Sequence, residues 1–236
     1  MTAFLIFALG LMCSRYGAIR LGPDDARPEF SRLTWFAMLF SAGMGIGLLF
    51  YSVAEPLMHY GSPPTGEAKT ALAAHQAMGI TFFHWGLHPW ALYAVVGLSL
   101  AYFSFRRGLP LSMGSAFEPL LGDRIEGFLG DVIDILAVVS TLFGVATSLG
   151  LGAMQVNAGL EHLFGVSVSM GIQMVIIAVI TLMATVSVVT GLKAGVRRLS
   201  ELNMGLAALL LLFVFVMGPT LALCGGFMDN LIAYAK

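Results

Sequence analysis

Apolar residues gather in six long runs along the chain, and polar residues fill the short stretches between them. The runs lie near residues 2–19, 33–54, 71–105, 132–156, 166–192 and 202–224. All but the first reach the ~20 residues that an α-helix needs to cross a bilayer. Runs of this length predict an all-α, polytopic helical membrane protein. Pro89 lies inside the third run and predicts a kink or an unwound turn there.

The second run carries three glycines in its middle, within Ser41-Ala42-Gly43-Met44-Gly45-Ile46-Gly47. Each glycine costs ~1 kcal/mol relative to alanine in a helix interior, so a plain span disfavours such a cluster. A helix that opens at mid-depth frees backbone N–H and C=O groups, which lipid cannot satisfy and which must meet a ligand, an ion or water. Close packing of neighbouring helices is the alternative, and on the glycines alone it is slightly favoured.

The composition supports a membrane protein and excludes several other classes. The chain is 58% hydrophobic and 11% charged, and its mean hydropathy is +0.89. It has no basic patch for nucleic acid and no set of nucleophile, base and metal ligands, so an enzyme is not expected. Cys13 and Cys224 lie in apolar runs as ordinary packing residues. His84 and His88 are four residues apart, but no carboxylate or cysteine completes a metal site nearby.

The basic residues predict the orientation in the membrane. Ten of the 12 lysines and arginines lie in alternate connections, residues 15–32, 106–131 and 193–201. The positive-inside rule places these three loops in the cytoplasm. Met1 then lies outside, at the start of a run that is short for a span, and the chain stops at Lys236, just after the sixth run. These two features predict that the chain is a fragment of a longer reading frame.

Aromatic residues concentrate in the third run. Trp85, Trp90 and Tyr93 fall within an arc of about 140° on a continuous helix. Three large rings on one face suit a cage for a quaternary ammonium group, because a desolvated cation over aromatic faces gains about 2 kcal/mol. The alternative is an interfacial belt, where tryptophan and tyrosine gather in membrane proteins. The run alone does not decide between cage and belt.

The fourth run carries small and polar residues on one helical face. These residues are Thr141, Gly144, Ser148, Gly152 and Gln155, within about 80°. Such a stripe is typical of helix packing, and its hydroxyls can also supply oxygen ligands to Na⁺. Thr147 lies off the stripe as a separate candidate ligand. No charged residue lies securely at the membrane centre, so a proton relay through a carboxylate is not expected.

Three motifs together resemble the betaine/carnitine/choline transporter family. They are WFAMLFSAGMGIGLLFYSVAEPLMHYGSPP (35–64), FFHWGLHPWALYAV (82–95) and GVATSLGLGAMQVNAGL (144–160). The resemblance implies half of a leucine-transporter-like fold of two inverted repeats. Residues 33–224 would form the first five-helix repeat, residues 1–20 part of the preceding helix, and residues 225–236 the start of an external loop. The second repeat would be missing.

The resemblance also assigns roles to residues. Trp85, Trp90 and Tyr93 would surround the trimethylammonium group, and the unwound stretch would contact substrate through Gly43, Met44, Gly45 and Gly47. Carbonyl oxygens of Ser41 and Met44 would bind Na⁺, and a second sodium site would use Thr147, with Thr141 and Ser148 as further candidates. Choline-handling members tend to have aspartate at the last glycine of the motif, so Gly47 favours glycine betaine or a similar zwitterion.

Two functions remain open at this point. The first is secondary transport of a quaternary-ammonium osmolyte across the cell membrane, with Na⁺ as the coupling ion and no other cofactor, in an assembly that is often trimeric in the family. The second is a half-transporter that does not transport and only binds or scaffolds with a partner chain. A reading frame that continues past Lys236 into four or five more spans would favour the first.

Overall fold

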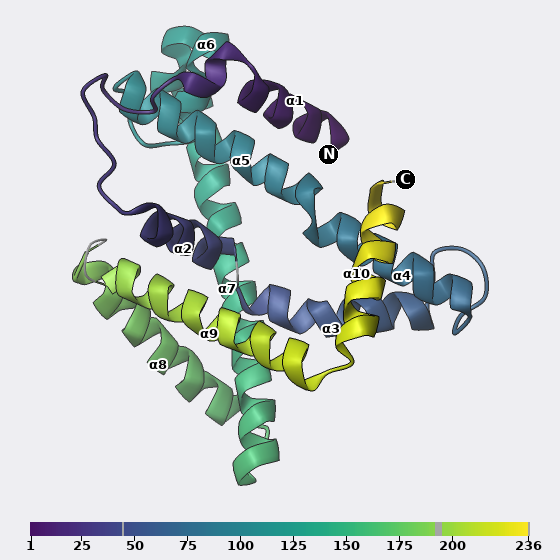
Figure 1. The fold of residues 1–236 in the computed structure, drawn as a ribbon. Coiled ribbons are helices and arrows are strands. Elements are labelled where there is room, and N and C mark those ends of the chain that lie inside the picture. Colours follow the sequence, from purple (N-terminus) through teal and green to yellow (C-terminus); the bar gives the residue numbers. More distant parts are fainter. Residues whose placement is uncertain (44, 192–194, 236) are drawn as a thin grey trace. The chain divides into compact units, whose positions relative to one another are not determined.

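The computed structural model describes residues 1–43, 45–191 and 195–235, and every regular element in these ranges is helical (Figure 1). The longer helices are α1 (Thr2–Cys13), α2 (Arg32–Gly43), α3 (Ile46–Gly61), α4 (Ala71–Trp85), α5 (Leu87–Ala101), α7 (Phe128–Phe164), α8 (Met170–Val189), α9 (Arg197–Met217) and α10 (Thr220–Ala235). Short turns of helix lie in the connections: η1 (Arg15–Ala18), η2 (Tyr102–Arg106), η3 (Gly114–Phe117), α6 (Glu118–Leu121) and η4 (Gly122–Glu126). The predicted all-α class is confirmed.

The chain divides into two compact units. The first unit comprises Met1–Pro28 and Phe83–Val145, and the second comprises Glu29–Phe82 and Ala146–Lys236. The unit boundaries fall inside α4 and inside α7, so each of these helices contributes residues to both units. Each unit is described by itself below.

In the first unit, α1 packs along α5 (Figure 1). Arg106, at the end of η2, holds the connection that follows α1: its Nη1 donates to the Gly22 carbonyl at 3.0 Å and lies 2.6 Å from Oδ1 of Asp24. Further along, the Gly114 N–H donates to Oδ1 of Asp134 at 2.6 Å. Two of the three loops that the charge pattern places in the cytoplasm, residues 15–32 and 106–131, are therefore fastened to helices by polar contacts.

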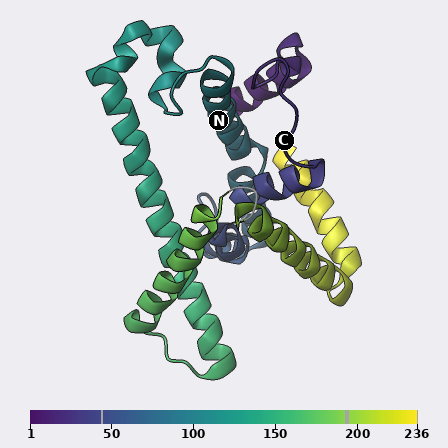
Figure 2. The same cartoon turned by 90° about the vertical axis from the view of Figure 1, so that its left-hand side faces the viewer.

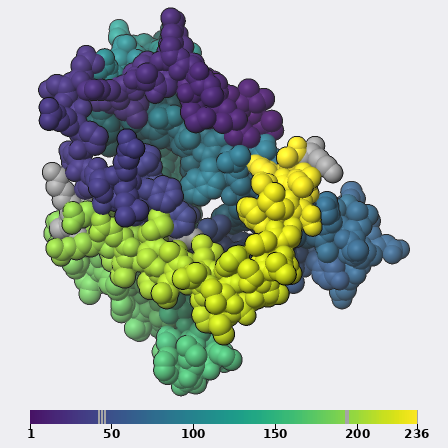
Figure 3. Space-filling view, viewed as in Figure 1, coloured from purple at the N-terminus to yellow at the C-terminus, as the bar shows by residue number. Residues whose placement is uncertain are grey.

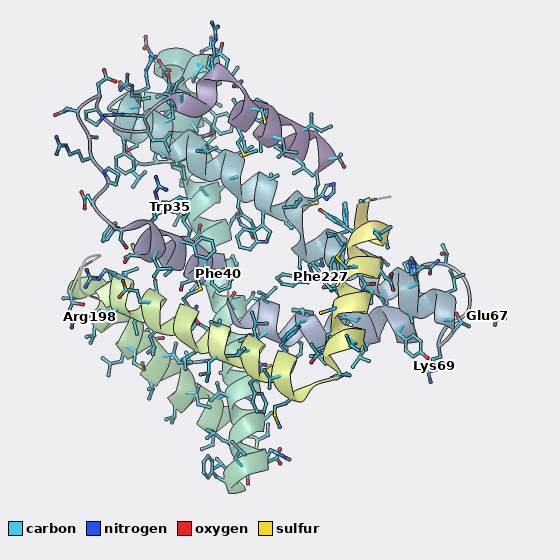
Figure 4. All side chains as sticks on the ribbon, viewed as in Figure 1. Trp35, Phe40, Glu67, Lys69, Arg198 and Phe227 are labelled. Carbon is cyan, nitrogen blue, oxygen red and sulfur yellow. The ribbon has the colours of Figure 1, made fainter. Side chains whose placement is uncertain are left out.

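In the second unit, α2 packs on α9, and α10 turns back beside α9 (Figure 2). Figure 1 shows α8 leaving the C-terminal end of α7 at an angle. The fully buried Asn157 fixes the turn between these two helices, because its Nδ2 donates to the Ser167 carbonyl at 3.3 Å and its Oδ1 accepts the Ser169 N–H at 3.1 Å. The ring of Phe227 on α10 lies 6.1 Å from that of Phe82 on α4 (Figure 4).

The second apolar run is open, as the family resemblance implied, although the glycines alone slightly favoured close helix packing. In place of one span over residues 33–54, α2 ends at Gly43 and α3 begins at Ile46. Gly45 precedes α3 in an extended conformation, with φ −94° and ψ 177°. The helix stops because the clustered glycines weaken it, and neither half is long enough to cross a bilayer alone. Met44 lies outside the described residues.

The predicted break at Pro89 is also confirmed, a few residues upstream of the proline. α4 ends at Trp85, Gly86 leaves the helical conformation, and α5 begins at Leu87. Pro89 is then the third residue of α5, where a helix has no partner for its N–H groups in any case. The break accommodates the proline without a lost internal hydrogen bond.

The boundaries of several predicted elements were wrong. Residues 225–235 were expected to begin a loop, but they lie in α10, since the glycine-proline pair 218–219 ends α9 and starts a new helix. The connector at 193–201 is shorter than expected because α9 begins at Arg197. The second apolar run was expected to end near residue 54, yet α3 continues to Gly61 with Pro56 inside it.

Four helical stretches within the described residues are long and apolar enough to cross a membrane: Ala71–Arg106, Phe128–Phe164, Met170–Val189 and Arg197–Met217. Their side chains are mostly uncovered. In Figure 3, α9 and α10 expose much of their side-chain surface, and Leu209, Leu211 and Leu212 on α9 are 66%, 64% and 62% exposed. Apolar faces of this extent suit contact with lipid or with further protein, as a polytopic membrane protein requires.

Candidate functional site

The aromatic run lies at the break between α4 and α5. Because Pro89 has no N–H, it cannot donate the helical hydrogen bond that the Trp85 carbonyl would otherwise accept. The indole Nε1–H of Trp90 donates to that carbonyl instead, at 3.1 Å. The contact satisfies a carbonyl that lipid could not satisfy and sets the direction of the Trp90 ring.

The rings of Trp90 and Tyr93 form one aromatic pair, with centroids 5.8 Å apart and planes at 51°. Both rings are open to the surroundings: Trp90 is 42% exposed and Tyr93 is 67% exposed. A tilted pair with uncovered faces has the geometry that can receive a cation over the ring surfaces.

Trp85 departs from the predicted arrangement. A common arc for the three aromatic residues assumed one continuous helix, but Trp85 ends α4 while Trp90 and Tyr93 lie on α5. The arc therefore holds for Trp90 and Tyr93 alone. The half-buried Trp85 places its ring 5.4 Å from that of His84 and reaches Trp90 through its main-chain carbonyl. The neighbouring His88 ring lies 4.6 Å from Phe83.

The unwound stretch joins the end of α2 to the start of α3. Ser41 and Gly43 lie in the last turn of α2, and Gly45 and Gly47 flank the first residue of α3. The last carbonyl groups of a helix point away from its end, and the first N–H groups of a helix point away from its start. The break therefore presents both kinds of group within a few residues, and Met44, between them, is not described.

The hydroxyl of Ser41 makes two hydrogen bonds to another helix. Its Oγ donates to the Ser200 carbonyl at 3.2 Å and accepts a hydrogen bond from Nδ2 of Asn203 at 3.1 Å. Both partners lie on α9, one turn apart. Sequence reasoning missed them, although Ser200 and Asn203 are conspicuous as polar residues at the start of an apolar run. The polar character of these two residues at the start of an apolar run was the signal in the sequence that could have pointed to an interhelical contact.

The hydroxyl candidates of the fourth run all lie on α7. Thr141 is exposed and donates from Oγ1 to the Ala137 carbonyl of its own helix at 2.8 Å, while Thr147 and Ser148 are also exposed. Thr141 belongs to the first unit, and Thr147 and Ser148 belong to the second. On the same stripe Gly152 is buried, whereas Gly144 and Gln155 are exposed, so the predicted packing surface is covered at Gly152 and open at the other positions. Roles of the hydroxyls as sodium ligands stay predictions.

Charged groups near the site are few among the described residues. The carboxylate of Glu55 is buried in α3, 3.6 Å from Nε2 of His59 one turn later. Asp24 lies in the connection after α1, outside the helices that can span, and the Arg106 guanidinium holds the pKa of its carboxyl below the ordinary value through a hydrogen bond and its charge. The described part of the chain contains no group of three or more His, Cys, Asp and Glu side chains that could hold a metal ion.

Long apolar helices interrupted at two points define a multi-pass α-helical membrane protein of the transporter class. The family model described as BCCT, betaine/carnitine/choline family transporter, matches residues 1–236, and the chain belongs to this family. Family members are transporters and not enzymes.

Curated relatives agree with this assignment. Glycine betaine transporter 1 of Vibrio parahaemolyticus is 53% identical over 237 residues, which cover 99% of this chain and 45% of the relative. Glycine betaine transporter OpuD of Bacillus subtilis is 50% identical, with 99% and 46% covered, and the glycine betaine transporter of Acinetobacter baylyi is 52% identical, with 94% and 34% covered. The chain thus spans between a third and a half of the length of these relatives.

Proposed function

We propose that this chain forms the first repeat of a secondary transporter for glycine betaine or a closely similar zwitterion. The observation that carries the proposal is the aromatic pair of Trp90 and Tyr93, whose exposed rings are fixed beside a break in a membrane helix. Three bacterial relatives that are named glycine betaine transporters support the same substrate.

The substrate's trimethylammonium group would lie against Trp90 and Tyr93, with Trp85 completing this side of the cage. A quaternary ammonium group cannot donate hydrogen bonds, so a carboxylate gains less from it than from a primary amine. Aromatic faces offer a negative surface without needing to be desolvated as ions, which makes them the suitable partner in an apolar environment.

The substrate's carboxylate would be met by backbone groups at the unwound stretch. Gly43, Met44, Gly45 and Gly47 bring a ligand close to the main chain, and the start of α3 offers N–H groups and the positive end of its dipole. Choline has no carboxylate to use these groups. Gly47, where an aspartate would supply a counter-charge for choline, therefore favours the zwitterion.

Coupling to Na⁺ completes the proposed mechanism. Carbonyl oxygens of Ser41 and Met44 would bind one sodium ion, and a second would use Thr147, with Thr141 and Ser148 as alternatives. Carbonyl and hydroxyl oxygens are ligands suited to a hard cation. The complete transporter would lie in the cell membrane as a homotrimer, with residues 15–32, 106–131 and 193–201 in the cytoplasm.

Uptake of radiolabelled glycine betaine tests the function. The complete gene product that contains this chain is reconstituted into liposomes, and uptake is measured with an inward Na⁺ gradient, with a K⁺ gradient and with no gradient. Sodium-driven accumulation that excess unlabelled betaine suppresses is the expected result. Uptake that does not depend on the Na⁺ gradient would refute the proposed coupling. The absence of betaine uptake and binding would refute glycine betaine as the substrate.

A further inference from the structure

A polar seam joins α2 to α9 within the second unit. At the start of α2, Oγ1 of Thr34 donates to Oε1 of Glu201 at 2.8 Å. In the last turn of α2, Ser41 accepts a hydrogen bond from the Asn203 amide and donates one to the Ser200 carbonyl. These contacts bridge positions about 160 residues apart in the sequence, so they are tertiary contacts and not part of either helix's own ladder.

The seam is tightly packed because its residues are small. Thr34, Ala37 and Ser41 recur at helical spacing on one face of α2, and Ala37 is only 2% exposed. Ser200, on the facing side of α9, is 5% exposed. Small side chains let two helix backbones approach closely, and a hydrogen bond between them is then costly to leave unmade in an apolar setting.

The seam ends where the second run opens. Two residues after Ser41, α2 stops at Gly43, and α3 starts separately at Ile46. Gly45, the residue before α3, is extended, so the helical hydrogen bonds of α3 do not continue back through it to α2. The direction of the last turn of α2 therefore depends on what holds that turn from the side, and the described contacts that do so come from α9.

We propose that Asn203 is a positioning residue that clamps the last turn of α2 to α9, so that these two helices move as one body. Asn203 acts through the Ser41 hydroxyl and does not itself contact substrate or ion. The consequence for the ion rests on the proposed function: the clamp sets the direction of the Ser41 carbonyl, the oxygen proposed to bind Na⁺.

Amide hydrogen exchange tests the clamp without any reference to transport. The complete gene product is compared in nanodiscs as wild type, Asn203→Ala, Ser41→Ala and the double variant. Loss of the hydrogen bond between Asn203 and Ser41 should speed exchange in residues 39–43 by about three- to tenfold in Asn203→Ala. Ser41→Ala also loses the bond to the Ser200 carbonyl, and the double variant should exchange no faster than Ser41→Ala, because that substitution already removes the contact with Asn203. Exchange across α8 should not change.

Two further variants separate the clamp from general destabilisation. Ser41→Thr keeps the hydroxyl and should restore slow exchange in the last turn of α2. Ser99→Ala removes a hydroxyl that only donates to the Val95 carbonyl of its own helix, at 2.8 Å, and should leave α2 unchanged. The proposal would be overturned if Asn203→Ala exchanged at the wild-type rate in residues 39–43. It would also be overturned if the faster exchange were confined to α9.

The sodium dependence of uptake tests the consequence for the ion. Asn203→Ala should raise the half-saturating Na⁺ concentration by about three- to tenfold while the KM for betaine at saturating Na⁺ stays within about twofold. Faster exchange in α2 with an unchanged sodium requirement would overturn the positioning role. If wild-type uptake needs no Na⁺, the coupling proposal fails by itself, and the exchange experiment still decides whether the clamp exists.

Discussion

Replacing Trp90 separates the hydrogen bond of its indole from the cation contact proposed for its ring. The indole N–H donates to the Trp85 carbonyl, and the ring, paired with Tyr93, is proposed to receive the trimethylammonium group. Trp90→Leu removes both the N–H and the ring. Trp90→Phe removes the N–H and keeps an aromatic face, although a less electron-rich one.

The expected magnitudes differ for the two variants. A desolvated cation–π contact contributes about 2 kcal/mol, so Trp90→Leu should weaken betaine binding by about 30-fold. Trp90→Phe should lose less, on the order of fivefold. Both variants leave the Trp85 carbonyl without its indole partner, which costs about 1 kcal/mol of stability in either case. If the ring itself binds the cation, the two variants should therefore have similar stability, and Trp90→Leu should bind betaine more weakly than Trp90→Phe.

Equilibrium binding of radiolabelled glycine betaine to the purified complete gene product measures these effects. Thermal unfolding is followed on the same samples, so that misfolded variants are recognised. Trp35→Leu is the matched control, because Trp35 lies on α2, is 56% exposed and takes no part in the aromatic pair (Figure 4). A folded Trp90→Leu variant that binds betaine as tightly as the wild type would refute the reasoning, as would an equal loss in Trp35→Leu.

Three further predictions follow from single positions. Gly47→Asp should weaken betaine binding by at least about tenfold and improve choline binding, because the new carboxylate repels one substrate and attracts the other; competition binding with both substrates measures the shift. Asp24→Asn should speed trypsin cleavage after Arg20, because the loop loses its ion pair with Arg106. The pKa of Asp24 is lowered in the folded loop, so this stabilisation is present at neutral pH and should fade as the pH falls below about 4. Asn157→Leu should lower the apparent Tm, since a Ser167 carbonyl and a Ser169 N–H lose their partner at about 1–3 kcal/mol each; unchanged thermal unfolding would contradict the role of this buried amide.

Local features of the chain were predictable from the sequence. The break near Pro89 was, because proline acts on the backbone of its own segment. The break after Gly43 followed from the family resemblance, since the glycines alone slightly favoured close helix packing. The end of α9 was not placed correctly, even though Gly218 and Pro219 supply a stop signal, because the apolar run continues past them to residue 224. Apolar character alone does not distinguish one helix from two that follow each other closely.

Contacts between distant segments were not predictable. The hydrogen bonds of Ser41 with Asn203 and Ser200 depend on which faces of α2 and α9 pack together, and a single sequence does not show which helix faces meet. The common arc of the aromatic residues failed for a related reason. It assumed an unbroken helix through Gly86, and the break moved Trp85 onto a different helix from Trp90.

An experimental structure of the complete gene product with glycine betaine bound tests the central claim most directly. The account predicts that the trimethylammonium group lies within about 6 Å of the ring centroids of Trp90 and Tyr93, with the carboxylate toward the stretch from Gly43 to Gly47. Density for betaine away from both rings, with the Trp90 indole still bonded to the Trp85 carbonyl, would contradict it. In that case the aromatic run would serve only to stabilise the break between α4 and α5.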